Sequence, residues 1–363
     1  MFDLEFYRGK RVFVTGHTGF KGAWLCRMLQ KAGAELTGFA LPPSTDPSLF
    51  SLLKVQNGMA SVIGDVRDFD TLYAAFCRAH PEIVFHLAAQ PLVRESYREP
   101  RQTYETNVMG TVNLLECVRR TDCVRSLLNI TTDKVYQNRE WEWGYRENEP
   151  LCGFDPYSNS KSCSELVTHS YNSSFLAERG IAVSTARAGN VIGGGDFSPD
   201  RIIPDCIRAA LAGREIVIRN PHSTRPYQHV LEPIFAYLMI AARQQETPLL
   251  AGSYNVGPDE ADCLVTEQLV ALFATVWGDS VRYVVRGDGG PHEASFLKLD
   301  CARIKHRFGW HPTLSITDAV RMTVEWTREW VGGGDLCAMT DRQIEAFLAA
   351  SAAHSIRERE HEL

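Results

Sequence analysis

A tyrosine and a lysine one helical turn apart give the clearest chemical signal in the sequence. Tyr157 and Lys161 are four residues apart, so on a helix their side chains lie side by side. Of the twelve tyrosines, only Tyr157 has a lysine four positions further on. A phenol becomes a general base only when its pKa falls well below the usual value, which an adjacent ammonium favours. The pair therefore predicts a tyrosine that removes a proton, although an exposed helical Tyr-Lys pair without function has the same spacing.

A second group of polar residues follows an apolar run. Thr132, Asp133 and Lys134 come after residues 126–131, which are typical of a strand. At the carboxyl edge of a parallel sheet, α/β proteins bind their ligands. A hydroxyl, a carboxylate and an amine there supply what alcohol oxidation coupled to acid-base chemistry needs. The alternative is a capped strand end without a catalytic function.

Three glycines at a three-residue spacing indicate an anion site near the N-terminus. Gly16, Gly19 and Gly22 follow the apolar run 11–15 and lead into the amphipathic stretch 21–32. Gly16 permits a tight turn, Gly19 lets the backbone approach a pyrophosphate, and Gly22 allows close packing of helix on strand. The helix N-terminus adds free N–H groups and partial positive charge. This context favours a dinucleotide site over a glycine turn without a ligand.

The second strand does not decide which dinucleotide is bound. Residues 38–41 at its tip include no Asp or Glu for the adenosine ribose and no Arg for a 2′-phosphate. Asp65, at the end of the third strand, is a candidate for the adenine amino group. The alternative is that Asp65 caps the helix that starts near Asp68.

Short apolar runs alternate with helical patterns through the first half of the chain, which predicts a parallel sheet covered by helices. The expected strands are 11–15, 35–41, 61–65, 82–88, 126–131 and 181–187, and the expected helices include 21–32, 68–80, 102–120 and one that begins near Tyr157. The fold class is therefore α/β, a Rossmann-type doubly wound parallel sheet with a smaller C-terminal substrate-binding domain. We expect a cofactor domain over 1–188, a substrate domain mainly over 189–350 with elements that cross over, and a charged tail over 351–363.

Composition excludes several classes of protein. The 363 residues carry a formal charge of −6 without a basic stripe or a polybasic segment, so we expect no nucleic-acid binding and no membrane binding. The ten cysteines form no Cys-x-x-Cys pair and have no neighbouring His cluster, which argues against a disulfide framework and against a metal site. No apolar run is long enough to span a bilayer, so a cytoplasmic protein is expected.

The chain resembles the extended short-chain dehydrogenase/reductase family over nearly its whole length. The family motifs are matched at Thr15–Gly22 and Tyr157–Lys161, with Asn107 on the helix before the fifth strand and His86–Ala89 at the end of the fourth. The resemblance implies that a nicotinamide dinucleotide binds at Gly16, Thr18, Gly19, Phe20, Gly22, Asp65, Val66, Leu87, Ala88, Ala89, Asn107, Tyr157 and Lys161.

Within that family, Thr132-Asp133 is similar to the sugar-nucleotide 4,6-dehydratases, in which an acid follows the catalytic Thr. Most of those relatives have a Glu at the next position, where this chain has Lys134. Together with Ala89–Arg94, Asn138–Tyr145 and Asp155–Lys161, this triplet is similar to the CDP-glucose 4,6-dehydratases. The resemblance implies conversion of CDP-D-glucose to CDP-4-keto-6-deoxy-D-glucose, with hydride transfer from C4 to NAD and back to C6. Because such a cofactor is regenerated in each cycle and needs no link to the NADPH pool, NAD is expected rather than NADP.

The resemblance also implies roles for the five catalytic candidates. Tyr157, helped by Lys161 and Thr132, takes the proton of the 4-hydroxyl, and Asp133 protonates the departing 6-hydroxyl. The base at C5 stays open. Lys134 can serve only in its neutral form, and the alternative is that it binds a sugar hydroxyl or pairs with Asp133. Acting as an acid requires the protonated form of Asp133, which a neighbouring ammonium disfavours, so the two groups could share one proton.

Substrate contacts are expected from the second half of the chain, where cations should meet the two phosphates of a CDP-hexose. The candidates are Gln90, Asn190, Arg201, Arg225 and His292, with Glu293 beside the last. The resemblance also implies a homodimer or a homotetramer, assembled through the helices 102–120 and 157–177.

Three other functions share these signals. A nucleotide-sugar 4-epimerase also oxidises C4 with Tyr and Lys, but it needs no acid for a 6-hydroxyl, so Asp133 and Lys134 argue against it. A 4,6-dehydratase for another nucleotide hexose stays open. A non-enzymatic NAD(H)-sensing protein is disfavoured because Tyr157, Lys161 and Thr132 are all present.

Overall fold

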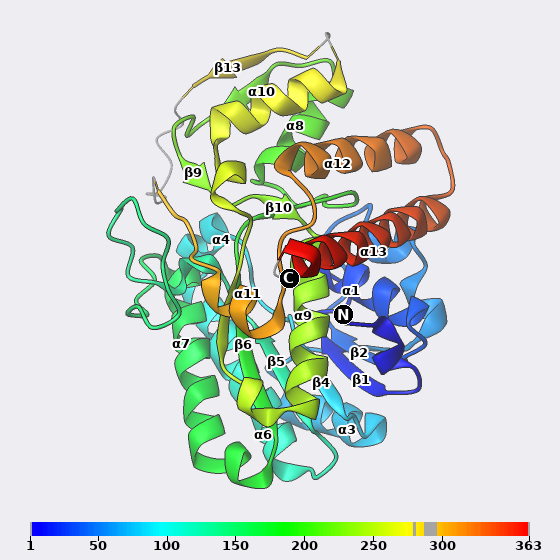
Figure 1. The fold of residues 1–363 in the computed structure, drawn as a ribbon, viewed down its shortest axis with the longest axis vertical. Coiled ribbons are helices and arrows are strands. Elements are labelled where there is room, and N and C mark those ends of the chain that lie inside the picture. The colour runs from blue at the N-terminus through cyan, green and yellow to red at the C-terminus, as the bar shows by residue number, and fades with distance from the viewer. Residues whose placement is uncertain (1, 279–280, 287–295, 362–363) are drawn as a thin grey trace.

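The computed structural model describes residues 2–278, 281–286 and 296–361, and it contains two lobes (Figure 1). The lower lobe in that view is built on a seven-stranded sheet with the strand order β11-β6-β5-β4-β1-β2-β3. Every neighbouring pair in this sheet runs parallel. The strand order 3-2-1-4-5-6 within it is that of a doubly wound dinucleotide-binding fold, so the predicted fold class is confirmed.

The elements of this lobe alternate as predicted. The strands are β1 (Arg11–Thr15), β2 (Glu35–Ala40), β3 (Ala60–Ile63), β4 (Ile83–His86), β5 (Ser126–Ile130), β6 (Ala182–Ala188) and, at the edge, β11 (Ser253–Val256). The helices are α1 (Phe20–Lys31), α2 (Leu49–Leu52), α3 (Phe69–Ala79), α4 (Val93–Arg98), α5 (Pro100–Tyr104), α6 (Gly110–Arg120) and α7 (Pro156–Tyr171). The six predicted strands each begin within one residue of the observed start.

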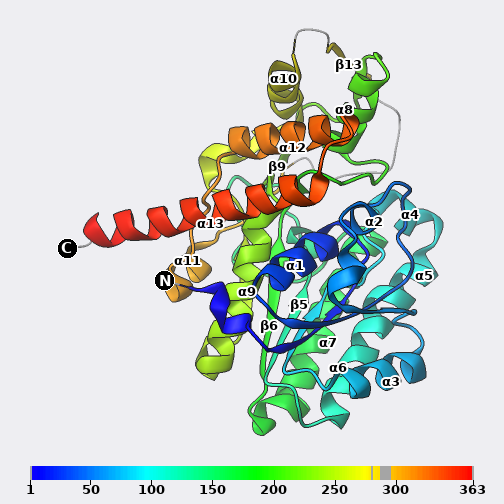
Figure 2. The same ribbon diagram turned by 90° about the vertical axis from the view of Figure 1, so that its right-hand side faces the viewer.

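Helices cover both faces of the sheet (Figure 2). On one face, α1 and α9 (Leu231–Glu246) share an apolar cluster with the strands, which includes Trp24 and Tyr237. On the other face, α3 and α6 contribute Phe76 and Leu115 to a second cluster. The strands β4, β5 and β6 are therefore buried along their whole length, as a parallel sheet between two helical layers requires.

One predicted helix is interrupted. The pattern over 102–120 predicts a single helix, whereas the chain forms the end of α5, a π-helical segment at Glu105–Met109 and then α6. A π-helical segment widens the helix by one residue and is frequent at functional sites. This one contains Asn107, which is buried and donates to Ser160 of α7.

The upper lobe comes from residues beyond 188. Its elements are β7 (Val191–Ile192), α8 (Ile202–Leu211), β8 (Ile216–Ile218), β9 (Thr224–Arg225), β10 (Gln228–His229), β12 (Leu264–Val265), α10 (Thr266–Trp277), β13 (Tyr283–Val285) and α12 (Ile316–Val331). An apolar cluster that includes Ile203, Phe273 and Val320 forms its core. The chain returns to the sheet as α9, β11 and α11 (Ala302–Phe308), so residues on both sides of position 188 build the lower lobe.

The last helix ties the C-terminal region to α1. α13 (Leu336–His361) runs out past the lower lobe (Figure 2), and Arg27 of α1 donates to both carboxylate oxygens of Asp341 at 2.8 and 2.7 Å. Residues 351–361 of the expected tail thus continue a helix, because alanine, glutamate and arginine favour helices.

Among the described residues, no helix is both long and apolar enough to cross a membrane. All ten cysteines are free thiols.

Candidate active site

The glycine turn forms a cradle at the N-terminus of α1. Gly16 has a φ of +79°, and a Cβ there would lie 2.7 Å from the amide nitrogen of Ala88, so the turn requires glycine. A Cβ on Gly22 would lie 2.1 Å from the carbonyl oxygen of Gly16. Gly19 is exposed, and a Cβ added there would lie 3.4 Å from the carbonyl oxygen of Gly16. The outer glycines therefore close the turn, whereas the middle one leaves the helix end open to an anion.

His17 occupies the space beside the second strand. Its buried ring lies over Gly38 of β2, where a Cβ would come within 2.3 Å of the ring. Its Nε2 is 2.7 Å from Oγ of Ser61 on β3. Burial lowers the pKa of His17 to about 4, which keeps the ring neutral. The hydroxyl of Thr18 donates to the carbonyl of Leu41 at 2.8 Å, so the turn is tied to the tip of β2.

A hollow lies beside the end of β3, where adenine was predicted. Its lining residues are Asp65, Arg67, Asp68, Glu105 and Met109. The Arg67 guanidinium donates to Asp65 at 2.6 Å and holds the pKa of that carboxyl below its usual range. The cap of α3 is Asp68, which accepts from the amide of Thr71, so the alternative role of Asp65 as a helix cap is wrong. Val66 is buried against Gly110 at the start of α6.

Asn107 and Gln90 fasten the loop that follows β4. Oδ1 of Asn107 accepts from the amide of Gln90 at 2.8 Å, and its Nδ2 donates to the Gln90 carbonyl at 3.1 Å and to Ser160 at 2.9 Å. The Gln90 side chain in turn bonds to Leu92 and Thr103. Both side chains thus use their polar atoms within the protein, and their contacts with cofactor and substrate stay predictions. They hold Leu87–Ala89 beside the glycine turn.

Tyr157, Lys161 and Glu165 form a stripe along α7. Asp155 caps this helix by accepting from the amide of Ser158, which starts the helix just before Tyr157. Lys161 is buried, and its Nζ donates to the carbonyl of Ile130 at the end of β5 over 3.1 Å. Burial lowers the pKa of Lys161 to about 8, against the opposing charge of Glu165.

The pKa of Tyr157 differs from the expectation. Burial raises it to about 12, although the neighbouring Thr132 hydroxyl and the charge of Arg201 both lower it. The prediction that Lys161 lowers the pKa of Tyr157 is wrong for this arrangement. Burial has the larger effect on that pKa, and the ammonium of Lys161 is directed to a backbone carbonyl. Tyr157 is therefore a buried phenol on which the charges of Asp133, Asp155 and Arg201 act.

The residues after β5 place an acid and an amine in the site. The hydroxyl of Thr132 donates to Oδ1 of Asp133 at 2.8 Å. The other oxygen, Oδ2, is buried and has no hydrogen-bond partner among the described residues. Lys134 is half-buried, and no carboxylate of the described chain pairs with it. The alternative in which Lys134 pairs with Asp133 is therefore not observed, and Oδ2 of Asp133 is left without a partner among the described residues.

Behind the site, a buried ion pair joins β6 to α7. Arg187 donates to both oxygens of Glu165 at 3.0 and 2.9 Å, and both side chains are only 3% exposed. Glu165 also accepts from the hydroxyl of Thr131, next to the catalytic loop. A buried pair is stable only when its remaining polar atoms have partners, which is the case here. Glu165 follows Lys161 by four residues, and that spacing was the signal that the sequence prediction missed.

Two cations complete the site. Arg201, just before α8, pairs with the buried carboxylate of Asp196 at 2.8 Å, and its charge acts on Tyr157. This predicted substrate residue therefore lies close to the predicted base. Lys21, the second residue of α1, is half-buried, and the charge of Asp133 acts on it. The prediction gave it no role, although it is the only Lys or Arg within the glycine motif.

The other substrate residues predicted from the second half of the chain are Arg225, Asn190 and His292. Arg225 on β9 is buried and donates to the carbonyl of Thr224, and Asn190 before β7 is half-buried. His292 and Glu293 lie outside the described residues. Across the described chain, no three His, Cys, Asp or Glu side chains gather in a way that could hold a metal ion.

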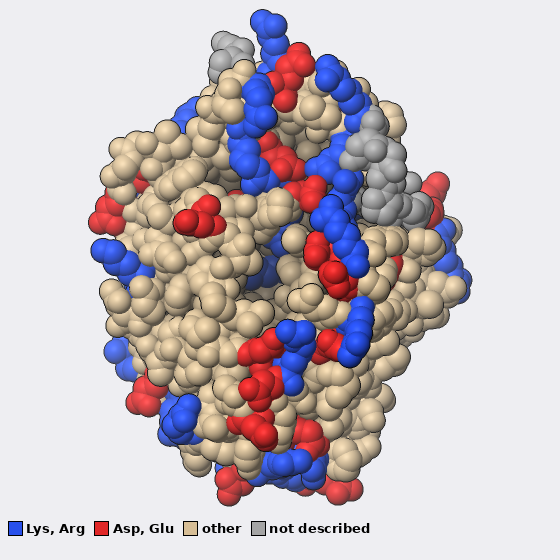
Figure 3. Space-filling model, turned by 180° about the vertical axis from the view of Figure 1, so that it is seen from behind, with Lys and Arg blue, Asp and Glu red and all other residues tan. Residues whose placement is uncertain are grey.

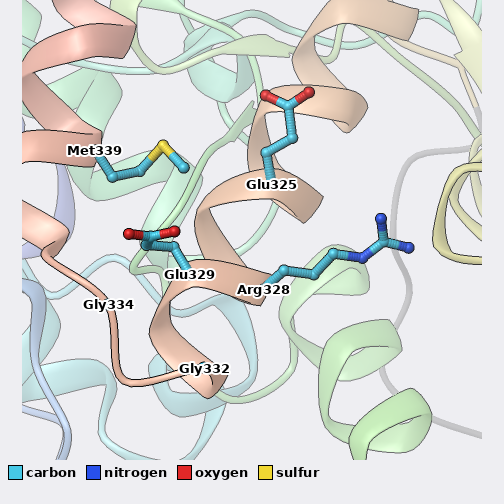
Figure 4. Close-up of a pocket in the computed structure, with 6 residues that line it drawn as sticks. All are labelled: Glu325, Arg328, Glu329, Gly332, Gly334 and Met339. Carbon is cyan, nitrogen blue, oxygen red and sulfur yellow. The ribbon is translucent and has the colours of Figure 1, made fainter.

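Figure 3 shows a hollow in the middle of one face, with lysine or arginine atoms visible inside it. A different hollow lies between α12 and α13, lined by Glu325, Arg328, Glu329, Gly332, Gly334 and Met339 (Figure 4). Its lining contains none of the predicted site residues, and Arg328 points away from Met339. This hollow is therefore separate from the glycine turn and from the end of β5.

The fold is shared with solved structures of two enzyme types. The dTDP-glucose 4,6-dehydratase from Streptomyces venezuelae, with NAD and TYD bound, has a TM-score of 0.76 at 24% identity and covers 89% of this chain and 98% of its own. The UDP-glucose-4-epimerase from Stenotrophomonas maltophila, with bound NAD and formylated UDP-arabinopyranose, has a TM-score of 0.78 at 22% identity and covers 89% and 99%. The fold alone therefore does not separate dehydratases from epimerases.

Sequence comparison is more specific. The CDP-glucose 4,6-dehydratase of Salmonella typhimurium is 47% identical over 357 residues, which is 97% of this chain and 99% of that protein. The family model described as GDP-mannose 4,6 dehydratase matches residues 13–323. The predicted place among the extended short-chain dehydrogenases/reductases is confirmed, and the chain belongs to the GDP-mannose 4,6 dehydratase family.

Proposed function

We propose that the chain is a CDP-glucose 4,6-dehydratase, which converts CDP-D-glucose to CDP-4-keto-6-deoxy-D-glucose with loss of water. Asp133 carries this proposal. Its Oδ2 is buried and free of hydrogen bonds to the described residues, and its charge acts on Tyr157. A 4-epimerase returns hydride to C4 and needs no acid at this position. The likeness to the Salmonella typhimurium enzyme supports the choice of nucleotide.

NAD fits the residues at the N-terminus of α1. The open face of Gly19 suits the pyrophosphate, and the hollow beside Asp65 suits the adenine. When bound, NAD would supply the acceptor, and later the donor, of the hydride that moves from C4 to C6 of the sugar. We assign Lys161 to orienting the dinucleotide beside Tyr157, since both lie on one face of α7.

Tyr157 exchanges the proton of the sugar 4-hydroxyl. Because burial raises its pKa to about 12, the phenolate form depends on positive charge nearby. Arg201, whose charge lowers the pKa of Tyr157, supplies positive charge there. The hydroxyl of Thr132 lies beside the phenol and helps to position the sugar oxygen.

Asp133 and Lys134 remove water from C5 and C6. Thr132 donates to Oδ1 of Asp133, so Oδ2 is the oxygen that carries the proton for the departing 6-hydroxyl. As the C6–O bond breaks, neutral Lys134 takes the proton from C5 and later returns it. The water carries away the hydrogen of the 6-hydroxyl and the proton from Asp133. The proton that Tyr157 takes from the 4-hydroxyl passes to Asp133, so both residues return to their starting states.

The proposal is tested by incubating the protein and NAD with CDP-, dTDP-, UDP- and GDP-glucose in parallel and by following the sugar nucleotides by mass spectrometry. CDP-glucose is expected to lose one water. Loss of water from another of these sugar nucleotides would change the assigned nucleotide specificity. Formation of an isomer, without a change of mass, would indicate an epimerase. As a companion variant, Asp133→Asn is expected to reduce NAD in a single turnover while the product keeps its water.

We also propose that two copies pair through α6 and α7. The supporting observation is exposed apolar surface on these helices and next to them, with Met109, Leu166 and Phe175 exposed by 50%, 55% and 45%. A helix bundle between two copies would cover these side chains. Light scattering is expected to give a dimer or a tetramer, and Leu166→Glu is expected to give a monomer. An unchanged mass would exclude this interface.

A further inference from the structure

Tyr237 is a buried tyrosine of α9 that has no part in the reaction described so far. Its side chain is fully buried in the apolar cluster between α9 and the sheet. Its hydroxyl has no hydrogen-bond partner among the described residues. By contrast, Tyr7 is equally buried in the same cluster but donates to the carbonyl of Leu238 at 2.7 Å. Leaving a buried hydroxyl unsatisfied is costly, so we expect Tyr237 to gain a partner during the reaction.

The direction of α9 carries the phenol of Tyr237 toward the carboxyl edge of the sheet. The helix lies against β5 and β6 (Figure 1), and near its end Gln244 donates to Oγ of Ser126, the first residue of β5, at 2.8 Å. Tyr237 lies seven residues before Gln244, a rise of about 10 Å along the helix. The five residues of β5 span about 13 Å, and helical side chains point toward the N-terminus of their helix. The phenol is therefore directed to the end of β5, where Asp133 and Tyr157 lie.

The charge of Asp133 acts on Tyr237. Burial raises the pKa of Tyr237 well above its usual value, and the charges of Tyr157 and Asp133 raise it further. The hydroxyl therefore keeps its proton, which makes Tyr237 a hydrogen-bond donor and not a second general base. Oδ2 of Asp133 is also buried and also lacks a hydrogen-bond partner within the described chain. A hydrogen bond from the phenol to this oxygen would satisfy both atoms.

We propose that Tyr237 is a positioning residue that donates to Oδ2 of Asp133 once this carboxyl has given its proton to the departing 6-hydroxyl. The inference rests on the proposed function, in which Asp133 is the acid of the water-loss step. In that step the electron pair of the C5–H bond forms the C5–C6 double bond as the C6–O bond breaks. The proton of Asp133 leaves with the oxygen as water, and Tyr237 keeps its own proton throughout.

The carboxylate that forms in this step would then have two donors. The hydroxyl of Thr132 already donates to Oδ1 of Asp133 at 2.8 Å, and Tyr237 supplies the donor for Oδ2. Donors aimed at a charge that develops in the transition state lower the barrier, because they are fixed in place before the reaction and are shielded from water. Tyr237 thus acts on the rate of water loss through Asp133, without contact with the sugar.

A structural role for Tyr237 would have a different consequence. Oxidation at C4 uses Tyr157 and needs no acid, so a hydroxyl that acts through Asp133 should leave that step unchanged. A general disturbance of the packing between α9 and the sheet would slow both steps. The rate of water loss relative to the rate of C4 oxidation therefore isolates the proposed effect.

The experiment compares Tyr237→Phe with the unmodified chain, with NAD bound, in single turnovers of CDP-glucose. The absorbance of the reduced cofactor follows C4 oxidation, and mass spectrometry of quenched samples follows water loss. C4 oxidation is expected at an unchanged rate, whereas water loss is expected to slow by about tenfold to a hundredfold, the effect of one hydrogen bond to a charged group. An unchanged rate of water loss, or equal slowing of both steps, would overturn the inference.

A second substrate tests whether the effect passes through the acid. In CDP-6-deoxy-6-fluoroglucose the leaving group is fluoride, which departs without a proton from Asp133. Tyr237→Phe is expected to release fluoride at close to the rate of the unmodified chain. Slowing as large as that seen with CDP-glucose would show that Tyr237 acts on another group and would overturn the inference.

Tyr7→Phe is the matched control variant, since it also removes one buried phenol hydroxyl from the same cluster. It is expected to lower the urea midpoint because the Leu238 carbonyl loses its donor, and to leave both rates unchanged. Tyr237→Phe is expected to keep the urea midpoint of the unmodified chain, because its hydroxyl has no partner among the described residues before the reaction.

Failure of the inference is distinguishable from failure of the proposed function. If the unmodified chain removes water from none of the four glucose nucleotides, the proposed function fails and the role of Tyr237 fails with it. If the unmodified chain removes water and Tyr237→Phe does so at the same rate, only the role of Tyr237 fails. If a nucleotide other than CDP-glucose loses water, the same comparison is made with that nucleotide and its 6-fluoro analogue.

Discussion

The residues that support the site and the residues that react differ in how their polar atoms are satisfied. Asn107, Glu165 and Arg187, the supporting residues, have protein partners for their side chains. In Asp133 and Lys134, the residues that we propose to react, Oδ2 and the ammonium have no partner within the described chain. A buried polar group without a partner costs about 1–3 kcal/mol, so it persists where a ligand completes it. Changes to the first set should therefore cost stability, and changes to the second should cost chemistry.

The largest effect is expected at Tyr157. The Tyr157→Phe variant removes the hydroxyl that exchanges a proton with the substrate, and such groups contribute about 10²–10⁴-fold, so kcat should fall by about 10³-fold. The alkali-induced absorbance of the 4-keto product measures this rate. Tyr283→Phe, on the partly exposed strand β13, is the matched control and should retain full activity. A fall of less than about tenfold would assign the proton transfer to another group.

The supporting residues are tested by Arg187→Met. This change leaves the carboxylate of Glu165 buried without its partner and should lower the free energy of unfolding by about 3–5 kcal/mol, as measured by urea denaturation. Adding Glu165→Leu to this variant should recover much of the loss, since two apolar side chains then replace the ion pair. If Arg187→Met alone were as stable as the unmodified chain, Arg187 would not be a supporting residue in the sense of this comparison.

Lys134→Met tests a residue whose change should cost activity and leave stability unchanged. Lys134 has no partner in the described chain, so the free energy of unfolding should change by less than about 0.5 kcal/mol. Loss of water from the oxidised sugar should slow by about 10²-fold or more if Lys134 is the base at C5. Single-turnover absorbance of the reduced cofactor follows this step. Water loss at a near-normal rate would exclude Lys134 as the base and return that role to another group.

Two glycines in the same turn sharpen the comparison further. In Gly22→Ala the new Cβ would meet the Gly16 carbonyl at 2.1 Å, so the fold should lose about 1–3 kcal/mol. In Gly19→Ala the closest approach is 3.4 Å, so stability should change by a few tenths of a kcal/mol, while NAD binding weakens because the methyl group occupies the anion approach. Urea denaturation and NAD titration separate the two outcomes. Equal effects of both variants on stability would contradict the assigned roles.

The last prediction concerns acid. Burial lowers the pKa of His17 to about 4 and the pKa values of His86 and His229 to about 3, whereas unfolded histidines titrate near about 6.5. Below that pH the unfolded chain binds more protons than the native one. Stability is therefore fully present above about pH 6.5 and falls toward pH 4 by up to about 1.4 kcal/mol per pH unit for each histidine. Denaturation curves at several pH values should show a shallower dependence for His229→Phe, and an unchanged slope would mean that His229 titrates normally.

Much of the fold could be predicted from the sequence because its signals are local. Apolar runs and helical periodicity gave the strand starts within one residue, and the spacing of Gly16, Gly19 and Gly22 gave the cofactor turn. The four-residue spacing of Tyr157 and Lys161 gave their common face on α7. The π-helical segment at Glu105–Met109 was not predicted, because a continuous helix has the same local pattern.

The sequence by itself determined the fold class and the family, and it predicted which groups react. Tertiary structure alone decided which polar groups are satisfied: Gln90 bonds within its own loop, and Oδ2 of Asp133 is left without a protein partner. It also decided that burial outweighs Lys161 in setting the pKa of Tyr157, and that Lys21 shares the site with Arg201. Burial and charge sum over neighbours that are distant in sequence, so spacing cannot reveal them.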